Sequence, residues 1–312
     1  MEFALATDQE QLQREARAFL EGRFPIERVA ELADSKEGWD PDSWSELAEL
    51  GWLGVTLPEE RGGIGLAWVE QAILFEELGR ALYPGPYFST VALALPALPE
   101  VLHDEIASGE VRWSAEVDGL VPDLALVERV VTDSGLAEAA GETLETMDST
   151  RRYGRLAPGG SREPYEGKID LTHAFVALAA EAVGVAQRAL EYAVEYASTR
   201  EQFGRKIGVY QAISHPLADT YVETEMARSL AYAAAWAVDS DPAAAPVAAA
   251  SAKAFAAETA VRACERSIQV HGGIGFTWEH ALHRYYKRAQ WIESFGGFPA
   301  AQRAKVAASL LD

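Results

Sequence analysis

Long alanine-rich segments with helical spacing of their apolar residues dominate the second half of the chain. They cover about 171–198, 211–240 and 246–271, and a shorter segment covers about 299–311. Alanine has the highest helix propensity of the common residues. Its small side chain also lets neighbouring helices approach closely, so long helices of this composition pack against one another. The sequence therefore predicts a helical bundle for this half of the chain.

Residues 1–112 also carry helical patterns, separated by turn-forming residues. Apolar residues with helical spacing occur in residues 8–24 and 68–82, and the proline at position 41 opens a further helix between them. A glycine-rich loop at residues 58–65 precedes the last of these helices. We therefore expect the first third of the chain to be helical.

Residues 113–167 differ from the rest of the chain. Short apolar stretches alternate there with turn signals such as Asp118-Gly119 and Pro158-Gly159-Gly160, and Val127–Thr132 has the composition of a strand. This pattern indicates a small β-rich insert. The predicted fold is mainly α-helical with a small β domain, in three parts: an N-terminal helical domain at 1–112, a shortened middle β domain at 113–167 and a C-terminal helical bundle at 168–312.

The formal net charge of −21 limits the partners of this chain. A field of that sign repels nucleic acid and anionic lipid, so an anionic ligand needs a local cationic site. Solubility, or the salt tolerance of the host, explains the same charge. No apolar run reaches the roughly 18 to 20 residues that span a bilayer. Because the N-terminus also lacks a signal-peptide pattern and Cys264 is the single cysteine, we expect a cytoplasmic location.

The first candidate site is the loop between the first two long helices. Residues 199–208, TREQFGRKIG, carry three cations and two glycines, and Tyr210-Gln211 follow them. In an acidic chain such a concentration of cations suits a phosphate group. A solvated helix connection, in which Arg200 and Lys206 pair with nearby acids, explains the same residues.

The second candidate site is the segment QVHGGIGFTW at residues 269–278. Consecutive glycines permit close approach of a ligand to the backbone and can present amide hydrogens to an anion. A helix C-cap explains Gly272 equally well. It does not require Gly273, Gly275 or the aromatic residues that follow.

The remaining reactive side chains form no nucleophile or metal motif. A single histidine beside glycines, such as His271, is more often structural than catalytic. His280 and His283 lie three residues apart, which can place both on one helix face, but no third ligand accompanies them. We therefore expect no metal site, and we expect Cys264 to lie in a helix core.

Together these segments resemble the acyl-CoA dehydrogenase family of flavoproteins. The resemblance is carried by AVGVAQRALEYAVEYASTREQFGRKIGVYQAI, LADTYVETEMARSLAYAAAWAVD and AKAFAAETAVRACERSIQVHGGIGFTWEHALHRYYKRA, in that order. GWLGVTLPEERGGIGLAWVEQAILFEELGRAL resembles the family's first helical domain. The resemblance implies a helical domain, a middle β domain and a C-terminal four-helix bundle. It also implies FAD, held across a subunit interface in a dimer or a dimer of dimers.

The reaction that the resemblance implies is α,β-dehydrogenation of an acyl-CoA thioester. A glutamate removes the α-proton while the β-hydride moves to flavin N5, and electron-transfer flavoprotein is the implied electron acceptor. Carried over position by position, the expected FAD-binding residues are Arg200, Glu201, Gln202, Phe203, Tyr210, Gln211, Gln269, Val270, His271, Gly272 and Gly273.

This chain departs from the family at the catalytic base. The family's Tyr-Glu-Gly-Thr segment aligns with Phe295-Gly296-Gly297-Phe298, so the base position is Gly296. Some members place the base on the first bundle helix, at a position that is Ala174 here, followed by Phe175 in place of a substrate-side arginine. Loss of a positioned base typically slows such a reaction about 10²- to 10⁴-fold. The candidate replacements for the base are Glu181, two turns away from Ala174, and Glu293, three residues away from Gly296.

The middle domain is also shorter than in the family, and the Thr-Glu-Pro-x-x-Gly-Ser-Asp segment that covers the flavin is missing. These departures resemble the short subunit of actinobacterial steroid-degrading acyl-CoA dehydrogenases, which assemble as α2β2 heterotetramers. The resemblance implies that a paralogous partner subunit supplies the base and encloses the flavin. This chain would then complete the FAD site from across the interface.

Two other hypotheses explain the same residues. One is a self-sufficient homomeric dehydrogenase with a relocated base such as Glu181 or Glu293. The other is an acyl-CoA-binding or scaffold protein without redox chemistry. The acyl group is not fixed by the sequence, since a steroid-derived acyl-CoA follows from the resemblance only.

Overall fold

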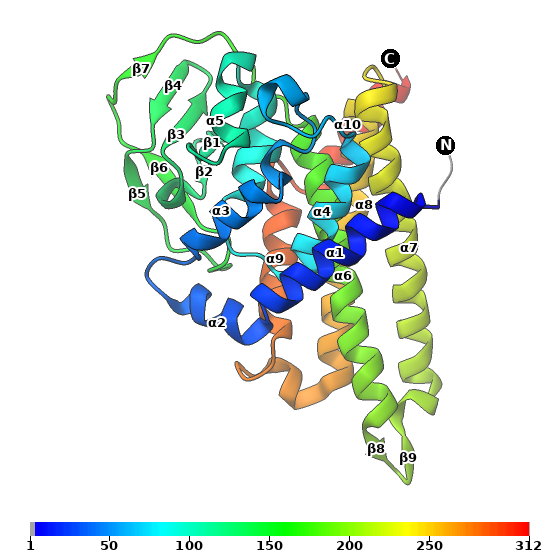
Figure 1. The fold of residues 1–312 in the computed structure, drawn as a ribbon. Helices are drawn as coiled ribbons and strands as arrows, with labels where there is room; N and C mark the ends of the chain where they lie inside the picture. Colours follow the sequence, from blue (N-terminus) through cyan, green and yellow to red (C-terminus); the bar gives the residue numbers. More distant parts are fainter. Residues whose placement is uncertain (1–3, 312) are drawn as a thin grey trace.

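The computed structural model describes residues 4–311, and long helices form most of it (Figure 1). The predicted bundle is present with nearly the predicted bounds. Its helices are α6 (Thr172–Thr199), α7 (Gln211–Ser240), α8 (Ala245–His271) and α10 (Pro299–Leu311). The alanines of α6 and α8 are buried where these two helices pack against each other. Small side chains therefore bring the helices together, as the composition predicted.

Helix α9 (Leu282–Ser294) was not predicted as a separate element. Its sequence, LHRYYKRAQWIES, is rich in charged and aromatic residues and has no alanine-rich run. Its buried side chains are Leu282, Tyr285, Arg288, Ala289, Trp291 and Ile292, and they follow helical spacing. Because one of the buried positions is an arginine, counting apolar residues alone does not reveal the helical pattern.

The N-terminal helices pack on the bundle through α4 (Trp68–Ala81), which lies against α6 (Figure 1). A Cβ on Gly184 would lie 1.9 Å from the Glu76 backbone oxygen, and one on Gly79 would lie 2.2 Å from the Glu181 oxygen. Only glycine permits this approach. The other N-terminal elements are α1 (Thr7–Arg23), α2 (Ile26–Asp34), α3 (Pro41–Glu49), α5 (His103–Ala107), a π-helical segment (Phe88–Ala94) and short 3₁₀ segments at Trp52–Gly54, Glu59–Arg61, Leu95–Ala97 and Glu100–Leu102.

Residues 113–163, here called the β region, form two small sheets (Figure 1). The first has the order β1-β3-β4-β7, with β1 parallel to β3 and the other pairs antiparallel. The second is antiparallel and has the order β2-β6-β5. The strands are β1 (Trp113–Ala115), β2 (Val121–Pro122), β3 (Arg129–Thr132), β4 (Gly135–Glu138), β5 (Gly141–Thr143), β6 (Tyr153–Leu156) and β7 (Arg162–Glu163), with a 3₁₀ turn at Leu124–Leu126.

The β region shares its interior with the helices. Trp113 and Val131 belong to the same continuous core as the helix residues. A buried charge cluster adds a polar contact: Arg288 on α9 donates to Asp148, at 2.6 Å, and to Glu181 on α6. Buried charges of this kind are tolerated only when paired. The cluster therefore couples the docking of the β region to the positions of α6 and α9.

Between residues 4 and 311, none of the helices combines the length and the apolar character needed to cross a bilayer. The same residues hold no group of three or more His, Cys, Asp or Glu side chains placed to bind a metal ion. Cys264 is fully buried in α8, as predicted.

Candidate functional site

The two loops singled out in the sequence meet at one end of the bundle. There a short hairpin, β8 (Glu201–Gln202) and β9 (Arg205–Lys206), projects from the end of α6 (Figure 1). Val270, at the end of α8, shares a small hydrophobic cluster with Ile207 and Ile213, which follow the hairpin. This cluster joins the two loops in one surface, although they lie far apart in the sequence.

The hairpin presents its side chains outward. Phe203 at its tip adopts a left-handed conformation, φ +54°, and is 91% exposed. The hydroxyl of Tyr210 donates to the Gln202 backbone oxygen at 3.1 Å, which fixes the hairpin against the start of α7. Among residues 4–311, Arg200, Arg205 and Lys206 form no salt bridge. The alternative in which Arg200 and Lys206 pair with nearby acids is therefore not what the structure describes.

The second loop divides into an exposed backbone and buried supports. Gly272 ends α8 with φ +63° and continues into a 3₁₀ segment, Gly272–Phe276. A Cβ on Gly272 or Gly273 would meet no atom within 4 Å, so this backbone borders open space. Val270 and His271 instead point into the protein, and the His271 ring stacks on Tyr196 at 4.4 Å. The exposed members of the predicted set are Arg200, Glu201, Gln202, Phe203, Gln211, Gln269, Gly272 and Gly273.

The residues that support this loop were not predicted from the sequence. The Tyr196 ring stacks on the His271 ring. The His280 ring, which follows the glycines in the sequence, lies 4.4 Å from the His271 ring. The available signal was the spacing of Tyr192 and Tyr196, which are four residues apart and therefore lie on the same face of α6. His280 was considered only as a metal ligand.

The base position, Gly296, lies in a closed loop between α9 and α10. Its backbone has φ +61°, and an added Cβ would lie 2.7 Å from Cε1 of Phe175. The Gln302 side chain donates to the Gly296 oxygen at 2.7 Å, and Lys253 Nζ donates to the Gly297 oxygen at 2.6 Å. The earlier base position, Ala174, is fully buried in α6. The loop thus holds its backbone tightly and has no acid at the family's position.

Aromatic side chains fill the interior behind this loop. Phe88 makes edge contacts with Trp291 and Phe295, at ring separations of 5.7 and 5.3 Å. Tyr153 of the β region stacks on Trp291 at 5.4 Å. The guanidinium of Arg151 lies 4.8 Å from the Trp291 ring centre. These contacts pack the interior around Phe295, the residue that precedes Gly296.

The two candidate replacement acids have different surroundings. Glu181 is 1% exposed, and its Oε1 accepts from Arg151 at 2.8 Å and from Arg288. Glu293 is half-buried on α9, and burial raises the pKa of its carboxyl. Glu181 is therefore committed to an ion-paired cluster, whereas the Glu293 side chain forms no ion pair in the described part of the chain.

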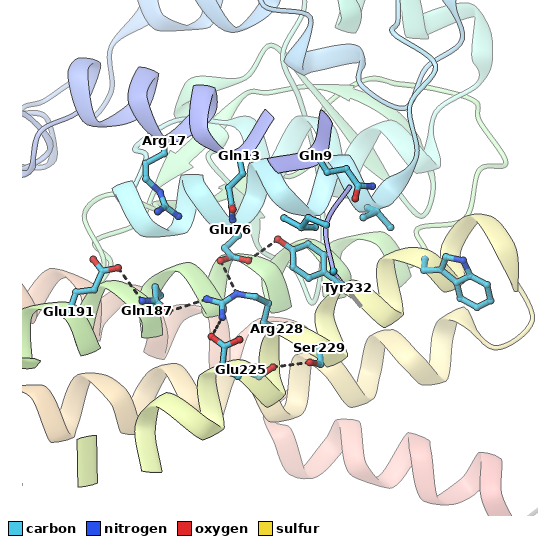
Figure 2. Close-up of a pocket in the computed structure, with 14 residues that line it drawn as sticks. Gln9, Gln13, Arg17, Glu76, Gln187, Glu191, Glu225, Arg228, Ser229 and Tyr232 are labelled. Atoms are coloured by element: carbon cyan, nitrogen blue, oxygen red, sulfur yellow. Dashed lines mark hydrogen bonds and ion pairs between the residues drawn. The ribbon is translucent and has the colours of Figure 1, made fainter. Parts of the chain in front are cut away.

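A cavity among the described residues lies elsewhere, between α1, α4, α6 and α7 (Figure 2). It measures about 460 Å³, and Arg228 forms its floor. Arg228 donates to Glu76 at 3.1 Å and to Gln187 at 3.1 Å, and it also pairs with Glu225. Tyr232 donates to the second oxygen of Glu76 at 2.9 Å. The pairing of Glu225 with Arg228 follows the i,i+3 spacing of a helix. No residue of the predicted set lines this cavity.

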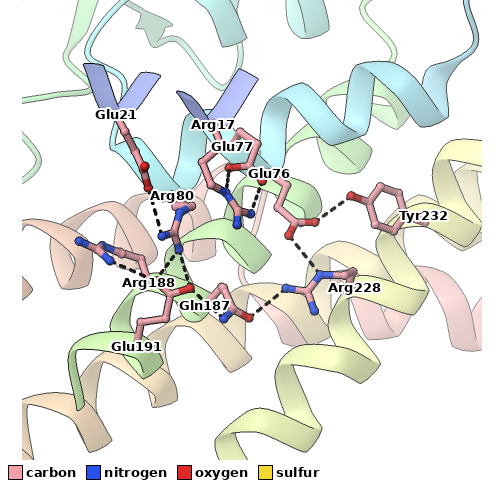
Figure 3. A network of polar contacts seen from close by, with 10 residues as sticks. All are labelled: Arg17, Glu21, Glu76, Glu77, Arg80, Gln187, Arg188, Glu191, Arg228 and Tyr232. Atoms are coloured by element: carbon pink, nitrogen blue, oxygen red, sulfur yellow. Dashed lines mark hydrogen bonds and ion pairs between the residues drawn. The ribbon is translucent and has the colours of Figure 1, made fainter. Parts of the chain in front are cut away.

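Further ion pairs beside this cavity join the helices to one another (Figure 3). Arg17 on α1 donates through Nε and Nη2 to Glu77 on α4, at 2.9 and 2.6 Å. Arg80 on α4 donates to Glu191 on α6 at 2.6 Å. Bidentate arginine–carboxylate contacts of this kind fix orientation as well as position. The Arg17 pair thus joins α1 to α4, and the Arg80 pair joins α4 to α6.

Comparison with known proteins identifies the family. The family model "acyl-CoA dehydrogenase, N-terminal domain" matches residues 6–102, and "acyl-CoA dehydrogenase, C-terminal domain" matches residues 169–311. Acyl-CoA dehydrogenase IpdE2 of Mycolicibacterium smegmatis is 31% identical over an alignment that covers 98% of this chain and 100% of that protein.

Solved structures agree with this result. The ChsE4-ChsE5 complex from Mycobacterium tuberculosis contains a chain that superposes with a TM-score of 0.88 and 26% identity, covering 100% of this chain and 99% of that one. A variant of the Tcur3481-Tcur3483 steroid ACAD superposes with a TM-score of 0.87 and 26% identity, covering 97% of both chains. The predicted mainly helical fold with a small β domain is confirmed. The chain belongs to the acyl-CoA dehydrogenase family of oxidoreductases.

Proposed function

We propose that this chain is the short subunit of a heteromeric FAD-dependent acyl-CoA dehydrogenase. It completes the FAD site of a paralogous partner subunit, and the partner supplies the catalytic base. The observation that carries the proposal is a contrast within one chain. Arg200, Arg205 and Lys206 are exposed and have no salt-bridge partner within residues 4–311, whereas the base position is a glycine.

The bundle end has the chemistry that a dinucleotide needs. Arg200, Arg205 and Lys206 supply cations for a pyrophosphate, and the backbone at Gly272 and Gly273 is open to close approach. When bound, FAD supplies the acceptor for the hydride of the acyl group. Because the loops project away from the chain's own interior, the flavin they meet belongs to a neighbouring subunit.

The chain's own base position does not fit the reaction. A base must reach the α-proton of the acyl group, and Gly296 has no side chain. The Phe175 ring fills the space directly beside it, 2.7 Å from where a Cβ would lie. This supports a partner subunit as the source of the base.

The flavin stoichiometry of the purified protein tests the proposal. The chain is expressed alone and together with a paralogous long subunit, and flavin absorbance is compared with protein concentration. One FAD per pair of unlike chains, with turnover only in the co-expressed protein, is the expected result. Full flavin content and turnover by the lone chain would contradict it. A colourless protein in every combination would favour the scaffold hypothesis.

A steroid-derived acyl-CoA is the proposed substrate class, with electron-transfer flavoprotein as the electron acceptor. The support is the structural neighbour described as a steroid ACAD. Oxidation of steroid-derived and straight-chain acyl-CoA by the assembled protein distinguishes the two substrate classes.

A homomeric enzyme with a relocated base is the second candidate, and one observation favours Glu293 for that role. Burial raises the pKa of this carboxyl, as is usual for a general base. In the homomer, Glu293→Gln abolishes turnover and leaves FAD bound. In the heteromer, the same change leaves turnover nearly intact.

A further inference from the structure

The aromatic residues that follow the glycines are not explained by a helix cap or by the proposed cofactor contacts. Phe276 and Trp278 are 79% and 78% exposed, and Ile274 before them is exposed as well. Residues 274–278, here called the aromatic loop, therefore present three large apolar side chains to solvent within five positions. Exposed apolar side chains that gather in one place mark an interaction site, whereas single ones are ordinary surface.

The Trp278 ring is held in place although it is exposed. The His283 ring meets it edge-on at 4.7 Å, and Nζ of Lys287 lies 4.5 Å from its ring centre. Both contacts come from α9, the helix that follows the loop. The backbone nitrogen and the hydroxyl of Thr277 donate to the Ile274 oxygen at 3.1 and 2.8 Å, which closes the turn before Trp278. A side chain fixed in advance loses little conformational freedom when it binds.

A groove of about 380 Å³ lies beside the aromatic loop. Phe276 and Gly275 line it from the loop, and Ile268 and Gln269 line it from α8. Gln269 also belongs to the residues expected to bind FAD, so the groove adjoins the proposed cofactor surface. Exposed aromatic rings beside a largely apolar groove are complementary to a protein surface that has large side chains of its own.

From these features we infer that the aromatic loop is the anchor by which this chain binds its paralogous partner subunit, with Trp278 and Phe276 as the main contacts. The inference rests on the proposed function, because the partner is the subunit whose FAD the neighbouring Gln269–Gly273 segment meets. It adds a division of roles. The aromatic loop holds the partner, whereas the cations of the hairpin hold the flavin.

The charges of the chain favour a different protein as the occupant of this surface. The net charge of −21 works against binding to anionic lipid and against binding to a second copy of the same chain. Lys287, beside Trp278, forms no salt bridge within residues 4–311, so its cation is available to a carboxylate. The matching surface of the partner is therefore apolar, with a carboxylate opposite Lys287.

The dissociation constant between this chain and the paralogous long subunit tests the inference. The two proteins are purified separately and titrated by calorimetry with FAD in excess. Trp278→Ala should weaken the association at least about tenfold, as is typical of a tryptophan at the centre of an interface. Trp278→Tyr retains an aromatic ring and should keep most of the affinity. Phe276→Ser gives an independent loss, and the thermal midpoint of each lone chain shows that the variant is folded.

Trp236→Ala is the matched control. Trp236 is also an exposed tryptophan, but it lies 25 residues after Gln211, the first residue of α7, and thus about 38 Å along the helix from the hairpin end. Its loss should change the dissociation constant by less than about twofold. Lys287→Met should weaken the association more at low salt than at high salt, because salt screens the attraction between its cation and the partner's carboxylate.

The outcomes separate this inference from the proposed function. An unchanged dissociation constant in Trp278→Ala, or an equal loss in Trp236→Ala, would overturn the inference and leave the heteromer standing. A loss of FAD affinity with unchanged affinity for the partner would assign the aromatic loop to the cofactor and overturn the inference as well. If the original chain does not associate with the paralogue at any FAD concentration, the proposed function itself fails.

Discussion

Arg288 Nε on α9 donates a 2.6 Å hydrogen bond to Asp148 Oδ2 in the β region, and both side chains are almost fully buried. The same guanidinium donates to Thr150 Oγ1 at 2.5 Å and to Glu181 on α6. One side chain thus joins three parts of the chain. Because α9 leads directly to the Gly296 loop, the contact also ties that loop to the β region.

Removing this guanidinium should destabilise the whole fold. Arg288→Met leaves Asp148 and Glu181 buried without their main partner, and breaking a buried pair from one side costs about 3–5 kcal/mol. Urea unfolding followed by circular dichroism measures the loss. Arg303→Met is the matched control, since Arg303 pairs with Glu258 at the surface, where a salt bridge contributes about 0–1 kcal/mol. Equal losses in the two variants would contradict a structural role for the buried cluster.

Asp123 should make stability depend on pH. Burial raises the pKa of this carboxyl to about 6, although Ser89 donates to it at 2.9 Å. An acid whose pKa is raised in the folded state contributes stability below its unfolded pKa of about 3.9, and that contribution is lost as the pH rises through about 6. Asp123→Asn should therefore be more stable than the original chain at pH 7 to 8, by at most about 3 kcal/mol, and should match it near pH 4.

Urea unfolding across this pH range checks the Asp123 prediction. Asparagine tolerates the left-handed backbone of Asp123, φ +55°. Asp118 has the same backbone conformation, φ +52°, but is exposed, so Asp118→Asn should change stability by less than about 0.5 kcal/mol at every pH. A gap between Asp123→Asn and the original chain that stays constant with pH would rule out titration of Asp123 as its cause.

Restoring a glutamate at position 296 should not restore a catalytic base. Gly296→Glu meets a left-handed backbone, which costs about 1–2 kcal/mol, and a contact with Phe175 that adds about 1–3 kcal/mol of overpacking. Gly159→Glu has a similar backbone, φ +78°, with no atom within 4 Å, so it isolates the first cost. Gly296→Glu should be less stable than Gly159→Glu by the cost of the overpacking against Phe175. The lone chain that carries Gly296→Glu should not oxidise acyl-CoA. Equal stability of the two variants would mean that the loop moves aside freely.

The bundle could be predicted from the sequence because its helices are long and their alanine content is unambiguous. The limits of α7 and α10 agree with the predicted ones. Helix α9 was missed because its pattern includes a buried arginine, whose partners come from distant segments. The meeting of the two loops followed from family resemblance, whereas the support of His271 by Tyr196 and His280 depends on tertiary packing that spacing alone does not determine.

The cations of the hairpin should control the binding of FAD. Arg200→Gln removes a charge that has no salt-bridge partner among the described residues, so its loss should leave the stability of the chain nearly unchanged. If Arg200 meets the pyrophosphate, the change removes a charge-assisted hydrogen bond of about 1.5–3 kcal/mol and should weaken FAD by at least about tenfold. Flavin fluorescence titration of the assembled protein measures this, and the effect should shrink at high salt because exposed charges are screened. Arg155→Gln, an exposed arginine on β6, is the control. Unaltered FAD affinity in Arg200→Gln would show that the hairpin does not bind the cofactor. An equal loss of affinity in both variants would show an effect of net charge alone.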